Sequence, residues 1–422
     1  MTQASLSIGS AAERTPGYFG WRVLIGAVVG LALSPGPVAL LLIGGFAPDL
    51  AVAHGWSFGA IMFSLTILNL ASIIAAPPAG YLIDRFGARA IMLPSIAMMA
   101  FCLLLWGYAD TLPRFYAISA LYGIATIGAQ SLTYTKLLTG WFDERRGLAL
   151  GIASAGLGLG YFVLPWIIAF SLGHFGRSGA SALIAGLLIL FPLSINLFVA
   201  YPRERVSESR TATDSKDGLT LTAAMATAPF WVMAAAIFLI SVVATGIVPN
   251  FANIARDAGF DRNEAAMIAS LFGLATLVGR LLVGWLFDRF FAPRVACAIF
   301  LLAGVGYALA AGASSLGLGL PLLALAVMLM GLGFGAESDL IGYLASRYYG
   351  YRHFGAIYGV LLSILILGVA AGPLAYGMAR DATGSYHVIL TASAVLGAVA
   401  GLLMLLLPRF PFASWNAKPM RA

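Results

Sequence analysis

Hydrophobic residues along the chain form long uninterrupted runs, without the short alternation of a half-buried strand. Because about 20 consecutive apolar residues cross a bilayer as a helix, these runs predict twelve transmembrane spans, which lie at residues 20–46, 58–82, 90–109, 114–138, 147–172, 180–200, 229–254, 264–287, 294–313, 320–345, 355–379 and 386–408. Proline adds a second prediction, since "SPGP" at 34–37 and Pro249 should kink the first and seventh spans near mid-membrane.

One long polar segment, residues 202–228, separates six spans from six. It predicts an N-terminal six-helix bundle at 1–201, a cytoplasmic linker at 202–228 and a C-terminal six-helix bundle at 229–422. The halves repeat, since "GYLIDRFGAR" at 80–89 returns as "GWLFDRFFAPR" at 284–294, an offset of 204 residues. The expected fold class is an all-α polytopic membrane protein with twelve helices in two six-helix pseudo-repeats.

Composition and charge agree with a membrane protein and set its orientation. The 422 residues are 61% hydrophobic and 10% charged, which excludes an ordinary water-soluble protein. With both termini in the cytoplasm, 18 of the 24 Lys and Arg residues face inward, as the positive-inside rule demands. We therefore expect a multi-pass plasma-membrane protein, in the inner membrane of a prokaryote, and no basic patch remains for nucleic acid.

The sequence carries no pattern of an enzyme or metalloprotein. Cys102 and Cys297 fall inside spans, and the four histidines are scattered without metal-ligand spacing. No nucleophile elbow, Walker loop or zincin motif is present, which argues against a membrane hydrolase and an ATP-driven pump. We expect no cofactor, no bound metal and no enzymatic activity, and a protein that functions as a monomer.

Two motifs identify a family. The loop after the second span matches the Gly-x-Leu-x-Asp-Arg-x-Gly-x-Arg signature, and on it the chain is identified as a member of the major facilitator superfamily; the matching residues are Gly80, Leu82, Asp84, Arg85, Gly87 and Arg89. "WFDERRGLALGIASAGLGLG" at 141–160 resembles the span-5 signature of monocarboxylate transporters and oxalate/formate exchangers. The resemblance implies the major facilitator fold, with alternating access to a carboxylate substrate.

The loop motif has a conformational role on physical grounds too. Gly80 permits close helix approach, and Asp84 at an inner helix end is placed to form an ion pair that breaks during transport. Arg85 and Arg89 either join that device or merely anchor the loop to the cytoplasmic side. In the second half, Asp288 and Arg289 repeat the pattern.

Arg280 is an always-charged residue inside the eighth span. Its side chain leans toward the outer, amino-terminal end of the helix, so snorkelling to the cytoplasm is disfavoured. Small residues share its face, which leaves room beside it; they are Ala269, Gly273, Thr276 and Gly284. A guanidinium fork suits a bidentate carboxylate, and the alternative is a structural ion pair. The resemblance supports binding, because monocarboxylate transporters carry a substrate-binding arginine on this span.

Glu337 and Asp339 are the acids of the tenth span, two residues apart and therefore on different faces. Either acid could carry a coupling proton. Alternatively, one pairs with Lys136 near the inner end of the fourth span and forms a gate.

At two positions this sequence departs from the monocarboxylate transporters that it resembles. Vertebrate monocarboxylate transporters use a span-1 lysine and an aspartate one turn before the span-8 arginine for proton coupling. This chain has no ionisable residue between Arg22 and Asp49, and Thr276 occupies the second position. The coupling proton must therefore bind elsewhere, or the protein exchanges anions.

Several uncharged polar residues complete the candidate site. Asn69, Gln130, Tyr134 and Thr276 are expected to orient the substrate, although each could instead join helices by hydrogen bonds. The predicted function is a secondary active transporter that moves a small organic monocarboxylate by alternating access, with proton coupling. The alternatives are an organic-anion exchanger and a proton-coupled efflux pump for lipophilic compounds. The expected partners are the carboxylate, protons and the lipid bilayer.

Overall fold

The computed structural model describes residues 18–139, 141–142, 145–198, 218–316, 319–350 and 353–410. In these ranges the chain is helical, and extended backbone pairs at one isolated bridge between Gly218 and Gly350. Contacts between residues divide the chain into two compact units. The first unit contains residues 1–207, 251–256 and 260–274. The second unit contains residues 208–250, 257–259 and 275–422. Most of the predicted linker lies outside the described residues, so the predicted boundaries at 201 and 229 stay a prediction.

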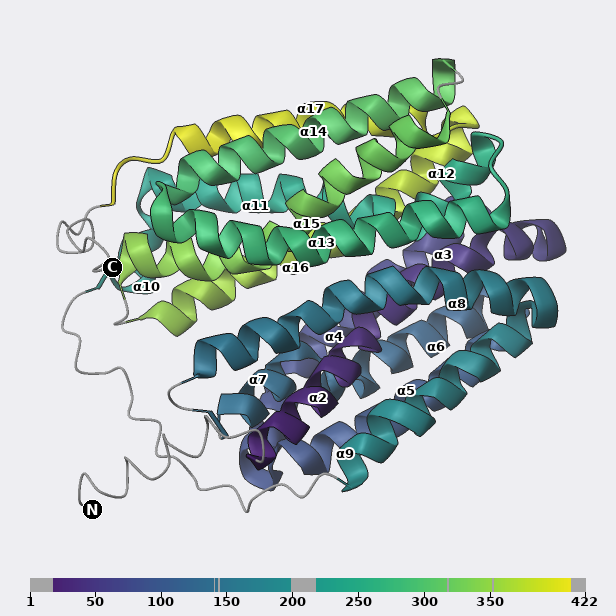
Figure 1. Cartoon of the computed structure of the whole chain (residues 1–422), viewed down its shortest axis with the longest axis horizontal. Coiled ribbons are helices and arrows are strands. Elements are labelled where there is room, and N and C mark those ends of the chain that lie inside the picture. Colours follow the sequence, from purple (N-terminus) through teal and green to yellow (C-terminus); the bar gives the residue numbers. More distant parts are fainter. Residues whose placement is uncertain are drawn as a thin grey trace. The chain divides into compact units, whose positions relative to one another are not determined.

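The helices of the first unit run from α2 to α9 (Figure 1). They are α2 (Phe19–Ala32), α3 (Pro35–His54), α4 (Phe58–Phe86), α5 (Ala88–Gly107), α6 (Leu112–Ala125), the short η1 (Ile127–Ala129), α7 (Ser131–Thr139), α8 (Arg146–Leu188), the π-helical η2 (Ile189–Leu193) and α9 (Ser194–Phe198). Helix α8 is central, because α2, α3 and α5 pack on it, and α4 packs on α6.

The second unit contains the helices that follow the linker. They are α10 (Leu221–Met225), α11 (Ala228–Ile247), η4 (Val248–Asn250), α14 (Ala292–Leu316), α15 (Leu320–Tyr349), α16 (Phe354–Thr383) and α17 (His387–Leu405). Helix α12 (Phe251–Asp257) belongs mainly to the first unit, and α13 (Arg262–Arg289) divides between the units after residue 274. Helix α14 runs beside α17 and also packs on α15, while α11 packs on α16 (Figure 1).

Ten helices in the described part of the chain are long and apolar enough to cross a membrane. Two features explain the difference from the twelve predicted spans. The apolar stretch Leu148–Leu197 has 50 residues and contains two predicted spans. The predicted fourth span is divided into α6, η1 and α7, each shorter than the 18 residues needed to cross alone. The all-α membrane fold predicted from the sequence is confirmed.

Helix breaks occur where proline and glycine require them. The first span is interrupted between Leu33 and Ser34, because Pro35 at the start of α3 has no backbone N–H to continue the preceding helix. The hydroxyl of the buried Tyr122 donates to the Pro35 carbonyl at 3.0 Å, which supplies a partner at this irregular point. The seventh span changes to a 3₁₀ turn at Pro249. Both predicted helix breaks are confirmed, and their position near mid-membrane stays a prediction.

Gly176 separates the two spans that α8 contains. Its φ of 64° and ψ of −167° lie in a region that side-chain-bearing residues rarely adopt. The next residue, Arg177, donates to the Gly107 carbonyl at 3.2 Å and to Asp110 at 3.0 Å. These bonds join the turn to the end of α5 within the first unit.

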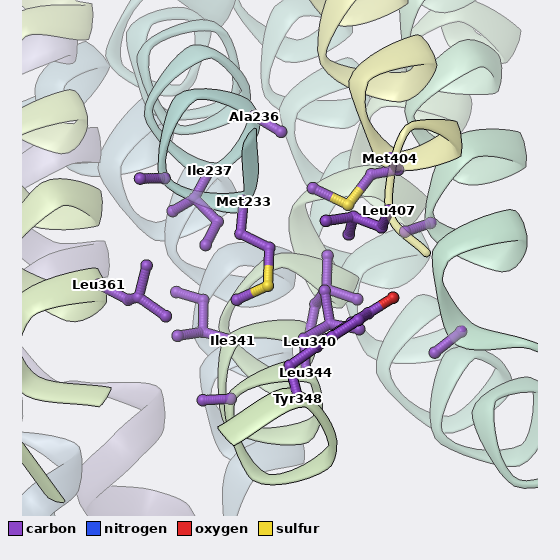
Figure 2. Close-up of a cluster of buried hydrophobic side chains, with 14 of the residues drawn as sticks. Met233, Ala236, Ile237, Leu340, Ile341, Leu344, Tyr348, Leu361, Met404 and Leu407 are labelled. Atoms are coloured by element: carbon purple, nitrogen blue, oxygen red, sulfur yellow. The ribbon is translucent and has the colours of Figure 1, made fainter. Parts of the chain in front are cut away.

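A cluster of buried hydrophobic side chains lies inside the second unit, contributed by α11, α15, α16 and the chain around the end of α17. Figure 2 shows Met233 and Ile237 of α11 between Leu361 of α16 on one side and Met404 and Leu407 on the other. Ile341 of α15 lies below them. All six side chains are at most 5% exposed, so α11 and α15 are tightly packed here, about one turn from the polar residues described next.

Candidate functional site

Helices α13 and α15 approach each other closely at two glycines. A Cβ atom added to Gly335 would lie 2.5 Å from the Thr276 carbonyl oxygen and 3.1 Å from the Arg280 backbone nitrogen. A Cβ atom on Gly279 would lie 2.8 Å from the Leu332 carbonyl oxygen. Small residues permit such backbone contact between membrane helices. These contacts set the distance between the helices that carry Arg280 and Glu337.

Arg280 lies about two thirds of the way along α13, within the span Arg262–Phe287. Its Nε atom is buried and has no hydrogen-bond partner within the described part of the chain. Its positive charge interacts with the carboxylate of Glu337 on α15. A guanidinium with a buried, unsatisfied donor atom is suited to bind an anion, because a charged donor without a partner costs more than a neutral one.

Glu337 is buried, with 5% of its surface exposed. The hydroxyl of the fully buried Ser241 on α11 donates to its Oε1 atom in a short hydrogen bond. Ser241 Oγ also lies 2.7 Å from the carbonyl oxygen of Ile237, one turn earlier on α11. Glu337 is therefore held by a hydroxyl group from α11 and interacts electrostatically with a guanidinium from α13.

Two further polar side chains surround this group. Tyr307 of α14 is 1% exposed, interacts electrostatically with Glu337 and donates to the Val243 carbonyl at 3.1 Å. Thr245 of α11 donates to the carbonyl of Ser241. The second unit thus contains a buried polar cluster from four helices, which we call the Glu337 cluster: Ser241, Thr245, Arg280, Tyr307 and Glu337.

Two of the small residues on the Arg280 face lie against the backbone of other helices. A Cβ atom on Gly273 would lie 2.2 Å from the backbone nitrogen of Phe162 in α8, so this position is filled by a helix of the first unit. Thr276 is fully buried, and its carbonyl contacts Gly335. Helix backbones therefore contact the small residues at these two positions, and the room expected beside the Arg280 side chain stays a prediction.

The other two residues proposed for coupling or gating lie in separate units. Asp339 belongs to α15, and its side chain is outside the described part of the structure. Lys136 is an exposed residue of α7 in the first unit. The predicted ion pair between them stays a prediction.

The polar candidates of the first unit lie on three different elements. Asn69 of α4 donates to the Leu65 carbonyl at 2.8 Å, as expected for a residue bonded within its own helix. Gln130 ends the 3₁₀ turn between α6 and α7, with extended backbone at φ −90° and ψ 169°. Tyr134 of α7 is 1% exposed, and its ring reaches α2 at Gly30, where a Cβ atom would lie 2.1 Å from its hydroxyl oxygen. Their part in substrate binding stays a prediction.

The conformational motif lies at the ends of its helices. Arg85, near the end of α4, donates to the Tyr81 hydroxyl at 3.3 Å. Arg89, at the start of α5, donates to the Leu197 carbonyl of α9 at 2.5 Å, where the helix dipole favours a positive charge. Arg289 at the end of α13 lies over the ring of Trp285, 4.0 Å from its centroid.

The remaining motif residues give less information. Gly80 has open space where a Cβ would point, so no neighbour among the described residues requires glycine there. The side chains of Asp84 and Asp288 lie outside the described part of the structure.

Sequence reasoning missed Ser241 and Tyr307 as members of the Glu337 cluster. The signal for Ser241 was its spacing from Thr245, because residues four apart lie on one helix face. For Tyr307 no sequence signal existed, since a tyrosine in a span more often joins the apolar core.

Comparison with known proteins extends this description to the whole chain. The sequence model described as Major Facilitator Superfamily matches residues 37–247 and 233–422. Monocarboxylate transporter 13 of Bos taurus is 28% identical over 421 residues, covering 97% of this chain and 94% of that protein. The oxalate:formate antiporter of Oxalobacter formigenes is 25% identical over 257 residues, 60% of each chain. The crystal structure of the nucleoside transporter NupG aligns with a TM-score of 0.75 and 14% identity over 92% of this chain and 99% of that one, a likeness of fold.

Proposed function

Because the chain belongs to the Major Facilitator Superfamily, we propose that it is a secondary transporter that moves a small organic monocarboxylate across the membrane by alternating access. Arg280 binds the carboxylate group. The observation that carries the proposal is the buried Nε atom of Arg280, a charged donor without a hydrogen-bond partner within the described residues, inside a membrane-spanning helix. A planar carboxylate accepts two parallel hydrogen bonds from such a fork.

The relatives support the substrate class without defining the substrate. Two of them are named for monocarboxylate transport and for exchange of oxalate against formate, and all of these substrates carry carboxylate groups. In the first unit, Gln130, Tyr134 and Asn69 orient the remainder of the molecule, and Thr276 supports Arg280 from the preceding turn. The transporter acts as a monomer in the plasma membrane, or the inner membrane of a prokaryote, with both termini in the cytoplasm.

Proton coupling is the second part of the proposal. Arg280 and Glu337 together carry no net charge when the carboxyl group is ionised, so an added carboxylate leaves one negative charge in a medium of low dielectric constant. Protonation of an acid, Glu337 or Asp339, removes that charge. Electroneutral exchange of organic anions is the alternative, favoured by the lack of an ionisable residue in the first span between Arg22 and Asp49.

The test is uptake of labelled monocarboxylates into proteoliposomes that contain the purified protein. Formate, lactate and benzoate represent small, hydroxylated and aromatic acids, and each is measured with and without a pH gradient and with internal unlabelled acid. We expect saturable uptake that Arg280→Lys weakens by about 10- to 100-fold in apparent affinity, because lysine keeps the charge and loses the bidentate fork. Arg262→Lys at the start of the same helix is the matched control and should retain wild-type affinity.

Three results would contradict parts of this proposal. Wild-type affinity in Arg280→Lys would exclude the carboxylate clamp. Uptake that does not depend on the pH gradient, and that is faster when unlabelled acid is present inside, would show exchange instead of proton symport. Background uptake of all three acids, together with export of a lipophilic cation that Glu337→Gln abolishes, would favour the efflux pump.

A further inference from the structure

We infer that Ser241 on α11 is the positioning residue that makes Glu337 the proton-carrying acid of transport, because its hydroxyl satisfies both protonation states of the carboxyl group. The inference rests on the proposed function, which leaves open whether Glu337 or Asp339 carries the proton. It assigns that role to Glu337, whose contacts the structure describes.

The argument begins with the hydrogen-bonding capacity of Ser241. A hydroxyl group has one hydrogen to donate and two lone pairs that accept. Ser241 Oγ has two acceptors within reach, the Glu337 carboxylate and the Ile237 carbonyl oxygen at 2.7 Å. The single hydroxyl hydrogen can therefore point in two alternative directions, and in each direction it meets a good acceptor.

Each position matches one charge state of Glu337. When Glu337 is ionised, Ser241 donates to the carboxylate, as the structure shows. When Glu337 takes up a proton from the aqueous phase, its new O–H group donates to Ser241 Oγ, and the Ser241 hydrogen turns to the Ile237 carbonyl. Ser241 gains and loses no proton, and the proton on Glu337 leaves later to the opposite aqueous phase. In both states the Ser241 hydroxyl hydrogen has an acceptor, and the added carboxyl O–H has one too, which avoids a cost of about 1–3 kcal/mol for each group.

The charges around Glu337 link proton binding to substrate binding. The groups that interact with it electrostatically are Arg280 from α13 and Tyr307 from α14, and Tyr307 in turn interacts with Tyr376 of α16. Helix α11 contributes hydroxyl groups and no ionisable residue. A carboxylate that binds Arg280 competes with Glu337 for the same positive charge, so each proton that neutralises Glu337 favours carboxylate binding, and the reverse follows by linkage.

Packing keeps the Ser241 hydroxyl in place while its hydrogen changes direction. Gly368 of α16 lies so close to Ser241 that a Cβ atom there would be 2.7 Å from the Ser241 Cβ. On α11, Ile237 lies one turn and Met233 two turns before Ser241, and both belong to the buried cluster that includes Ile341 of α15 (Figure 2). Only a hydroxyl hydrogen moves between the two states.

The experiment is an infrared titration of the purified full-length protein, read at the stretching band of protonated carboxyl groups. Glu337→Gln identifies the band of Glu337. Ser241→Ala removes the hydroxyl, and Ser241→Cys keeps a weaker donor of similar size. Ser64→Ala is the matched control, because Ser64 is also fully buried and donates to a carbonyl of its own helix, that of Ile61 at 2.6 Å. The same variants are then compared in uptake at a series of pH values.

We expect a titrating band that Glu337→Gln removes. Its midpoint should move upward by about one pH unit in Ser241→Ala, since the hydrogen bond to the ionised carboxylate is stronger than the one to the neutral acid and its loss therefore costs the ionised form more. Ser241→Cys should give a smaller upward shift, Ser64→Ala none, and the pH profile of uptake should follow the band. An unchanged midpoint in Ser241→Ala, or a band that moves while uptake does not, overturns the inference. The titration needs no substrate, so failure of the carboxylate assay contradicts the proposed function without affecting this result.

Discussion

Gly335 offers the sharpest test of how the candidate site is held together. It lies two residues before Glu337 on α15 and contacts the backbone of α13 at Thr276 and Arg280. Substitution by alanine adds a Cβ atom only 2.5 Å from the Thr276 carbonyl oxygen. Both contacting atoms are backbone, so no flexible side chain can move aside. The two helices themselves must separate.

The size of that separation follows from the contact distances. A Cβ atom is essentially never found within 3.0 Å of a neighbouring heavy atom, and ordinary contact begins at 3.4 Å. The difference from 2.5 Å requires α15 to move away by 0.5 Å at least, and by 0.9 Å for ordinary contact. Overpacking of this kind costs about 1–3 kcal/mol of stability. It also increases the separation of Glu337 from Arg280, which weakens their electrostatic interaction.

We expect Gly335→Ala to lower the midpoint of thermal unfolding in detergent and to reduce carboxylate uptake by about tenfold or more, since displacements near 1 Å in a positioned site have effects of that order. Gly342→Ala on the same helix is the matched control. A Cβ atom at Gly342 would lie 3.8 Å from its nearest neighbour, the ring of Tyr358, which is an ordinary contact. Alanine there should be neutral or stabilising by about 0.5–1 kcal/mol, because it favours the helix.

The comparison of the two variants tests the reasoning directly. If Gly335→Ala unfolds at the same temperature and transports at the same rate as Gly342→Ala, the close packing of α13 on α15 does not determine the geometry of the site. If Gly335→Ala is less stable but transports normally, the packing matters for the fold and not for the position of Arg280.

Two further predictions concern the helix breaks of the first unit. Gly176→Ala should destabilise the protein by about 1–2 kcal/mol, because a side chain is strained at φ 64°; thermal unfolding measures it, and Gly151→Ala, which meets open space in the same helix, is the control. Tyr122→Phe should cost about 1 kcal/mol through loss of the hydrogen bond to the Pro35 carbonyl. An unfolding temperature equal to that of Tyr108→Phe, whose ring is 68% exposed, would show that the bond does not stabilise the break.

The sequence alone determined the features that depend on local chemistry. Run length and hydropathy predict membrane helices because crossing a bilayer requires a fixed apolar length. The sequence also showed the prolines at 35 and 249, which interrupt a helix, and the charge of Arg280, which is unusual inside an apolar span. The two family motifs predicted the superfamily, and the match over both halves of the chain confirms it.

Only the tertiary structure decided which polar residues meet. Ser241 and Glu337 are 96 residues apart, and no periodicity relates them. In a helix surrounded by lipid and other helices, nearly every face is apolar, so the pattern does not show which face is internal. The same limit explains Gly273 and Gly335, because a small residue leaves space only if no backbone fills it. Helix packing, which the order of residues along the chain does not show, brought those glycines into close contact with other helices. It also brought Glu337 to the Ser241 hydroxyl and within electrostatic reach of Arg280.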